Sequence, residues 1–254
     1  MARVVRLNVT PLKSTALHHP ERIRIGPSGA VGDREFFLVT PEGRLLCGSK
    51  LGRLVRIRAE HDPERERLRV ILPDGPALEG PAAPGGERIE VDFWGRRVAA
   101  RILEGPWADA LTGFAGRPVG VARVERPGDG VDVRPLTLVS LASVGELARQ
   151  AGVERLDADR FRMTIEIDGV GPHEEDTWSG RPLRVGEALL SVGKPVPRCV
   201  VTTQDPATGE RDFPTLAAIR RYRGLLGDAE ICFGVYASVL EPGTVRVGDP
   251  VAPC

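Results

Sequence analysis

The 254-residue sequence has little lysine, no paired cysteines and no long apolar run. Only three lysines, Lys13, Lys50 and Lys194, stand among 35 basic residues, and the rest are arginines, whose forked side chain suits phosphate. Acidic residues also number 35, so no global field favours nucleic acid or a membrane surface as a partner. The opening "MARVVRLNVTPLKS" lacks the apolar stretch of a signal peptide, and we expect no membrane-spanning segment.

The four cysteines are scattered, and none forms a C-x-x-C pair. They are Cys47, Cys199, Cys232 and Cys254. This spacing does not fit an iron–sulfur or zinc framework. Free thiols are typical of a reducing cytoplasm, which is the location that we predict. An apolar content of 41% in a chain of this length provides for one large domain or two small ones.

Three segments of the first half each contain two apolar runs around a turn signal. They are "REFFLVTPEGRLL", "RLRVILPDGPAL" and "ERIEVDFWGRRVAARIL", with turns at 41–43, 73–75 and 94–95. Such pairs predict β-hairpins, and turns this close together predict a barrel or a sandwich. Strand-like patterns return in "RPLRVGEALLSVGKPVPRCVVTT", "ICFGVYASVL" and "GTVRVGDPVAPC". The chain is therefore predicted to be mainly β.

A few short helices interrupt this pattern. Ser143 and Glu146 match a capping box, which predicts a helix running to about Gln150 and closing at Gly152. The stretch "FPTLAAIRRYRG" predicts a second helix between its proline and its glycine. The Gly- and Pro-rich "LEGPWADALTGFAGRPVG" predicts a short helix over 107–111 and a domain boundary near residue 118.

The stretch "GKPVPRCVVTTQDPATG" leaves three roles open for Cys199: a buried hydrophobe, a nucleophile or a metal ligand. Its neighbours Arg198 and Lys194 favour the thiolate, the nucleophilic and ligating form. Free cysteine is also among the most buried residue types. The acidic residues around His173 in "GPHEEDTWSG" fit no metal-ligand spacing and indicate a solvated turn. A histidine in such a turn is a weak partner for Cys199, so the sequence gives little support to a Cys–His hydrolase.

Several basic and hydroxyl residues stand at strand ends or at a strand-to-helix junction, where free N–H groups and positive charge favour an anion. Arg160 and Arg162, two residues apart, are expected on one side of an extended segment. Each residue alone fits a solvated charge or a plain helix cap, and together they fit a phosphate cradle beside a thiolate. The set comprises Lys13, Ser14, Arg34, Ser140, Ser143, Arg160 and Arg162.

The chain resembles the MOSC-domain proteins, and more closely the subgroup with an N-terminal β-barrel domain that includes the amidoxime-reducing components. The resemblance is carried, in family order, by "PLKS", "VGDREFFLV", "LTLVSLASVGEL", "DADRFR", "EEDTWSG", "RVGEALLSV" and "PRCVVTTQDPATGE". It implies a MOSC N-terminal β-barrel domain over residues 1–118 and a β-barrel MOSC domain over 119–254. The implied fold is mainly β with a few short helices (α+β).

The resemblance also implies a molybdenum–pterin cofactor. Cys199 would be the metal ligand and the catalytic residue. The family pattern R-F-R-P-N is not kept, because Met163 and Thr164 follow Arg162 here, and threonine offers fewer hydrogen bonds than asparagine. The implied cofactor-binding residues are Lys13, Ser14, Arg34, Ser140, Ser143, Arg160, Arg162, Thr164, Arg198, Thr202 and Thr203.

The implied activity is a molybdenum-dependent, two-electron reduction of N-hydroxylated small molecules. A separate donor protein of ferredoxin or cytochrome type would supply the electrons, because no iron–sulfur motif is visible in the sequence. The alternative is a carrier of the molybdenum cofactor or of sulfur, related to cofactor sulfurases and without reductase turnover. A third interpretation is a plain β-barrel binding module in which Cys199 is buried.

Overall fold

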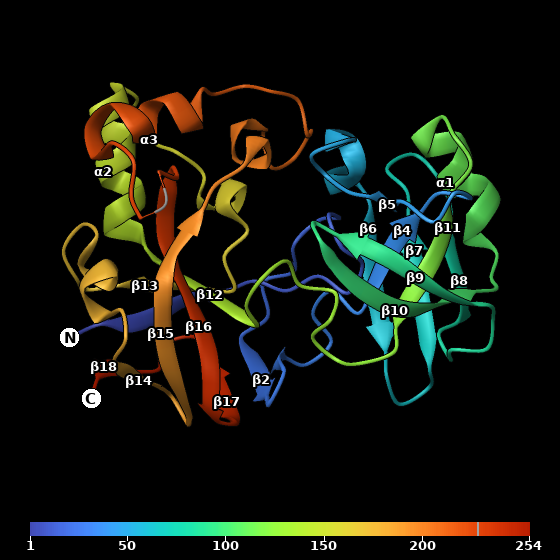
Figure 1. The fold of residues 1–254 in the computed structure, drawn as a ribbon, viewed down its shortest axis with the longest axis horizontal. Helices are drawn as coiled ribbons and strands as arrows, with labels where there is room; N and C mark the ends of the chain where they lie inside the picture. Colours follow the sequence, from blue (N-terminus) through green and yellow to red (C-terminus); the bar gives the residue numbers. More distant parts are fainter. Residues whose placement is uncertain (228) are drawn as a thin grey trace.

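The computed structural model describes residues 1–227 and 229–254, and it consists of two lobes that lie side by side (Figure 1). One lobe contains both chain termini, helix α2 (Leu141–Ala151) and helix α3 (Thr215–Arg223). The other lobe contains helix α1 (Trp107–Ala115). None of the helices in the described residues has the length and apolar character needed to cross a bilayer.

A seven-stranded sheet forms the framework of the lobe that holds the termini. Neighbouring strands are antiparallel except β12 and β13, which run parallel and are joined through α2. Parallel neighbours need such a crossover, because a tight turn cannot join them. In sheet order the strands are β1 (Arg3–Leu7), β13 (Ile165–Asp168), β12 (Leu136–Ser140), β16 (Cys232–Glu241), β15 (Ala188–Pro197), β14 (Pro182–Val185) and β18 (Val251–Pro253).

The beginning of the chain is built into this same lobe. Strand β1 pairs with β13, and a small sheet joins β17 (Gly243–Arg246), β2 (Arg22–Gly26) and β3 (Gly29–Ala30). Strands from before residue 118 are thus hydrogen-bonded to strands from the second half of the chain. The boundary near residue 118 stays a prediction.

The second lobe consists of hairpins, as the turn signals predict. One sheet has the order β5-β4-β11-β10-β9 and the other has the order β6-β7-β8. The predicted hairpins are β4–β5, β7–β8 and β9–β10. The strands are β4 (Phe36–Val39), β5 (Leu45–Leu46), β6 (Arg58–Asp62), β7 (Arg67–Ile71), β8 (Ala77–Pro81), β9 (Arg88–Phe93), β10 (Arg96–Leu103) and β11 (Gly120–Val124).

The mainly β fold with a few short helices is confirmed, and each lobe has its own apolar core. Leu7, Leu136 and Val235 belong to one core, whereas Phe36 and Trp107 belong to the other. Four 3₁₀ turns complete the described elements: η1 (Gly52–Arg56), η2 (Ala158–Phe161), η3 (Glu174–Trp178) and η4 (Val200–Thr203).

Helix α2 begins three residues earlier than the capping box predicts. Ser140 is the N-cap, and its hydroxyl oxygen accepts a hydrogen bond from the Ser143 N–H at 3.0 Å. Strand β12 therefore runs directly into the helix, and Ser143 lies within the first turn. The predicted close at Gly152 is confirmed, because this residue adopts φ 71°.

Candidate functional site

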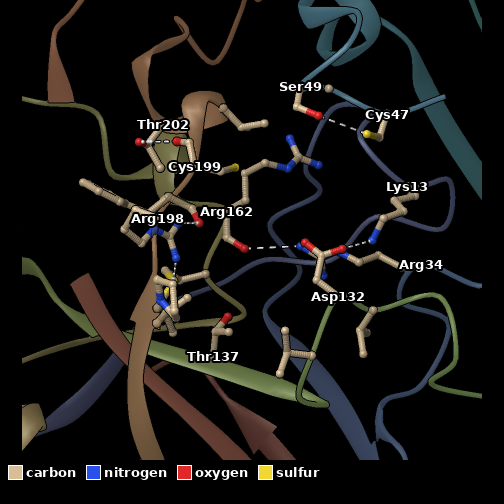
Figure 2. A pocket seen from close by; sticks show the side chains of 18 of the residues that line it. Lys13, Arg34, Cys47, Ser49, Asp132, Thr137, Arg162, Arg198, Cys199 and Thr202 are labelled. Carbon is tan, nitrogen blue, oxygen red and sulfur yellow. Dashed lines mark hydrogen bonds and ion pairs between the residues drawn. The ribbon is translucent and has the colours of Figure 1, made fainter. Parts of the chain in front are cut away.

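A cavity of about 730 Å³ is lined by residues of both lobes. Figure 2 shows Cys199 and Arg198 on one side of it and Lys13 and Cys47 on the other. Its size is typical of a pocket for a small molecule or a cofactor. The cavity brings together predicted site residues that are far apart in the sequence.

The thiol of Cys199 is exposed and lines this cavity. Strand β15 ends at Pro197, and the next residue, Arg198, donates its N–H to the Ile231 carbonyl at 2.7 Å. The N–H and the hydroxyl of Thr202 then donate to the Cys199 carbonyl oxygen at 3.2 and 3.0 Å. The backbone of Cys199 is held on both sides while its sulfur remains accessible. The interpretation of Cys199 as a buried hydrophobe is therefore wrong.

Lys13 is 4% exposed, and its ammonium group points into the other side of the cavity. Its Nζ donates to the Gly130 carbonyl oxygen at 2.8 Å and pairs with the Asp132 carboxylate. Burial lowers the pKa of Lys13, although Asp132 opposes this effect. Burial would raise the pKa of Asp132, but Lys13 and then Arg34 outweigh it, and the net pKa is below its usual range.

Arg34 and Arg162 lie beside each other. The Arg34 guanidinium pairs with Asp33 and donates to the Arg162 carbonyl oxygen at 3.2 Å, and Arg162 donates to the Thr15 carbonyl oxygen at 2.7 Å. Burial and then the neighbouring Arg34 lower the pKa of Arg162 to about 10. Within residues 1–227 and 229–254, no carboxylate forms a close ion pair with Arg162.

Arg198 also lacks a close carboxylate in the part of the chain that the structure describes. It donates to the Phe161 carbonyl oxygen and, at 3.5 Å, to the Met163 sulfur, while its Nε has no partner there. Burial lowers the pKa of Arg198, and the adjacent Cys199 opposes this effect. Two partly buried guanidinium groups with no close carboxylate among the described residues favour an anionic ligand.

Arg160 and Arg162 do not lie on an extended segment, which corrects the prediction. Residues Ala158–Phe161 form η2, and Arg162 follows it with φ 53°. Arg160 turns toward Asp212, to which it donates at 3.3 and 3.1 Å. Both arginines still line the cavity.

The cavity lining contains seven basic residues against two acidic ones. Such an excess of one charge raises the local concentration of ligands with the opposite charge. The basic residues are Lys13, Arg34, Arg96, Arg134, Arg160, Arg162 and Arg198, and the acidic residues are Asp132 and Glu230.

Three predicted hydroxyl residues, Ser14, Thr164 and Thr202, also line the cavity. The Ser14 oxygen accepts from the Gly48 N–H at 3.0 Å, and the Thr164 hydroxyl lies 3.3 Å from that of Thr137. Thr203 is not among the lining residues, and its hydroxyl donates to the Val200 carbonyl oxygen at 2.7 Å.

Ser140 and Ser143 are also absent from the cavity lining, contrary to the prediction. Both are fully buried, and they form a closed cluster with Glu175. The Ser143 hydroxyl donates to Glu175 Oε1 at 2.7 Å, and the Ser140 N–H donates to the same oxygen at 3.2 Å. The donors that the sequence offers to an anion are thus used by a carboxylate of the protein.

The segment around His173 is not the solvated turn that we predict from its charge. Glu175 is 0% exposed, and His173 contacts Tyr222 and Arg223. Among the described residues, no group of three or more histidine, cysteine, aspartate or glutamate side chains could hold a metal ion.

The residues that line the cavity but are not marked by the sequence patterns include Asp132, Cys47 and Trp94. Asp132 lies in "RPGDGVDVRP", which looks like a plain linker. Cys47 is buried, with its sulfur 3.3 Å from the Ser49 hydroxyl. A tryptophan before a glycine in a hairpin turn is the one local signal that could have marked Trp94.

Two family models match the chain: the MOSC domain over residues 122–252 and the MOSC N-terminal beta barrel domain over residues 1–118. The chain therefore belongs to the MOSC-domain proteins that carry this N-terminal domain, as its motifs predict. "Mitochondrial amidoxime-reducing component 1" from Homo sapiens is 34% identical, over 88% of this chain and 73% of that protein. Its namesake from Danio rerio is 30% identical, over 98% of this chain and 83% of that protein.

"Molybdenum cofactor sulfurase" from Anopheles gambiae is 29% identical over 93% of this chain but only 34% of that protein. The family and these relatives associate the chain with molybdenum-cofactor chemistry. The relatives are named for two different activities, so they leave reduction and sulfur transfer open.

Proposed function

We propose that this protein is a molybdenum-cofactor-binding oxidoreductase that reduces N-hydroxylated small molecules. The observation that carries the proposal is the exposed Cys199 thiol, which faces a cavity whose walls hold two partly buried arginines, Arg162 and Arg198, that have no close carboxylate among the described residues. The names of the relatives support the reaction, since two of them are amidoxime-reducing components.

The residues of the cavity fit the proposed cofactor. A thiolate is a suitable ligand for a soft metal site, and the cations suit the phosphate of a pterin tail. When bound, such a cofactor would supply the two-electron redox chemistry by which an N–OH group loses its oxygen as water. The unpartnered Nε of Arg198 and the absence of a close acid at Arg162, both within the described residues, leave donors for an anion.

Each side of the cavity has its own proposed task. Cys199 would hold the metal, since its backbone is fixed and its sulfur is accessible. Lys13, Arg34 and Arg162 would hold the anionic tail. Thr137 holds Thr164 in place, because the backbone N–H of Thr164 donates to the Thr137 hydroxyl oxygen at 2.9 Å. The remaining proposed contacts are Ser14, Arg160, Arg198 and Thr202, and we leave Ser140, Ser143 and Thr203 out of the proposed site.

The electrons are proposed to come from a separate carrier protein of ferredoxin or cytochrome type. The four cysteines do not gather into a cluster-binding array: Cys47 and Cys232 are buried, whereas Cys199 and Cys254 are exposed. The small-molecule substrate would enter through the cavity. The cytoplasmic location stays a prediction.

The alternative function is transport of the cofactor or of sulfur, the latter as a persulfide on Cys199. The exposed thiol suits either function, and the sulfurase relative favours this one. Turnover separates the two: benzamidoxime reduction with a reconstituted electron donor supports the reductase. Stoichiometric cofactor without turnover contradicts it and supports the carrier.

The metal-binding step is tested by elemental analysis of protein made in cells that synthesise the cofactor. We expect about one molybdenum per chain in the wild type, and less than about a tenth of that in Cys199→Ser, because the variant lacks the soft ligand. Cys254→Ser is the matched control, since Cys254 is exposed but does not line the cavity. Equal molybdenum in all three proteins would overturn Cys199 as the ligand.

A further inference from the structure

Trp94 differs from the other two tryptophans of the chain in its exposure. It is 60% exposed, whereas Trp107 is 0% exposed and Trp178 is 3% exposed. A tryptophan usually buries much of its large apolar surface. Trp94 instead lines the same cavity as Cys199, and so does Val133, which is 61% exposed. Both side chains are apolar, line the cavity and are open to solvent.

The backbone of Trp94 is also unusual. Phe93 pairs with Arg96, so Trp94 and Gly95 form a two-residue hairpin loop with φ 53° and 90°. A turn with positive φ at both positions favours asparagine, aspartate or glycine at the first position. A bulky residue there is strained, and strained residues concentrate at functional sites. Hairpin formation therefore does not explain why a tryptophan stands here.

The ring of Trp94 lies beside an aromatic neighbour and near a cation. The Phe93 ring lies 5.9 Å from it at 79°, an edge-to-face arrangement. Lys13 Nζ lies 5.5 Å from the centroid of the Trp94 ring. The indole is thus oriented beside the buried cations while more than half of the residue remains accessible. An indole in this position can stack against another planar ring.

We propose that Trp94, together with Val133, forms a subsite that stacks the planar aromatic ring of the substrate. This inference rests on the proposed function, and it adds the residue that would bind the ring of an aromatic N-hydroxylated substrate. A resident cofactor would occupy the deep cations, such as Lys13 at 4% exposure, whereas the exposed indole meets a ligand that arrives from solvent. The position is therefore suited to substrate rather than to the cofactor tail.

Two substitutions separate a ring-binding role from a structural one. Trp94→Asn places the residue that this turn favours before Gly95, so the hairpin should be at least as stable. Trp94→Phe keeps an aromatic ring. If Trp94 served only the fold, Trp94→Asn would lower the thermal midpoint. A midpoint at or above the wild-type value, with loss of ring binding, supports the proposal.

The first measurement is tryptophan fluorescence of the purified protein during titration with benzamidoxime. Since Trp107 and Trp178 are buried, saturable quenching reports on Trp94. We expect quenching in the wild type, none in Trp94→Asn and none with acetamidoxime, which has no ring. Saturable quenching by guanosine monophosphate but not by benzamidoxime would overturn the substrate subsite and assign the surface to a nucleobase. No saturable quenching by either ring would overturn it as well.

The second measurement is the KM of the cofactor-loaded enzyme for the same two amidoximes. Loss of ring stacking should raise the KM for benzamidoxime about three- to tenfold in Trp94→Asn. The KM for acetamidoxime and the kcat for both amidoximes should stay unchanged. In Trp94→Phe, which keeps an aromatic ring, the KM for benzamidoxime should stay close to the wild-type value. If both proteins turn over the amidoximes but the ratio of the two KM values is the same in Trp94→Asn as in the wild type, the subsite alone is overturned. Absence of turnover, with quenching by benzamidoxime intact, overturns the proposed function but supports the ring subsite.

Discussion

The cavity in front of Cys199 and the buried cluster around Glu175 both contain hydrogen-bond donors suited to an anion, but they differ in whether a carboxylate of the protein accepts from those donors. In the cluster, Glu175 accepts from the Ser143 hydroxyl and from the Ser140 N–H. In the cavity, Arg162 and Arg198 have no close carboxylate within the described residues. An anion site is thus recognised by donors that the protein leaves unmatched, since donors already paired offer a ligand little.

The largest effect expected from this comparison is on stability. Glu175→Ala would leave the Ser143 hydroxyl and the Ser140 N–H buried without their acceptor. We expect the free energy of unfolding to fall by about 3 kcal/mol, because each unmatched buried group costs its desolvation. Denaturant titration measures this change. Anion binding in the cavity should stay unchanged.

Glu174→Ala is the matched control for this substitution. Glu174 is the neighbouring residue of η3 but is exposed, and it accepts only from the Gly171 N–H at 2.8 Å. A loss within about 0.5 kcal/mol is expected, as for most surface substitutions. If the two variants were equally stable, the cluster would not be the closed structural unit described above.

The next effect is on ligand binding, where the cavity should respond and the cluster should not. Arg162→Gln removes a charge that has no close acidic partner in the described residues. We expect the affinity for pyrophosphate to fall about 10- to 100-fold, the equivalent of one charge-assisted hydrogen bond. Calorimetry on cofactor-free protein measures it.

Two further variants sharpen this measurement. Asp132→Asn should raise pyrophosphate affinity several-fold, because it removes the carboxylate that pairs with Lys13 and would repel the ligand. Ser143→Ala should leave it unchanged. A loss in Ser143→Ala as large as that in Arg162→Gln would contradict the separation of cluster and cavity.

Much of the fold was predictable because it depends on local signals. Hairpin turns such as Trp94-Gly95 determine register within a few residues, and the close of α2 at Gly152 requires only one left-handed residue. The start of α2 was predicted three residues late, since Ser140 and Ser143 are both acceptable caps. Only the direct passage of β12 into the helix decides between them.

The candidate site was less predictable, because its properties depend on residues distant in sequence. Lys13 meets Asp132 across 119 positions, and Ser143 meets Glu175 across 32. The sequence identified donors such as Arg162 and Ser143 equally well. It could not show that the buried Glu175 carboxylate accepts from Ser143, or that no carboxylate of the described residues pairs closely with Arg162.

The smallest effect expected is a pH dependence of stability that belongs to the cluster. The backbone N–H of His173 donates to the Ser143 hydroxyl oxygen at 2.8 Å, and the imidazole ring contacts Tyr222 and Arg223. Burial, and then the charge of Arg223, lower the pKa of His173 to about 4. Asp176 and Glu146 face the same ring and partly oppose this shift. The folded protein therefore keeps the ring neutral over a pH range in which the unfolded chain binds a proton.

Because the unfolded state binds more protons between about pH 6.5 and 4, the contribution of His173 is complete above that range and is lost as the pH falls through it. His173→Gln should reduce the acid slope of the free energy of unfolding. The difference should be about 1 kcal/mol or less, since the half-exposed ring is screened by solvent. Glu175 titrates in both proteins, so a slope that His173→Gln leaves unaltered would mean that this carboxylate, and not the histidine, gives the cluster its response to acid.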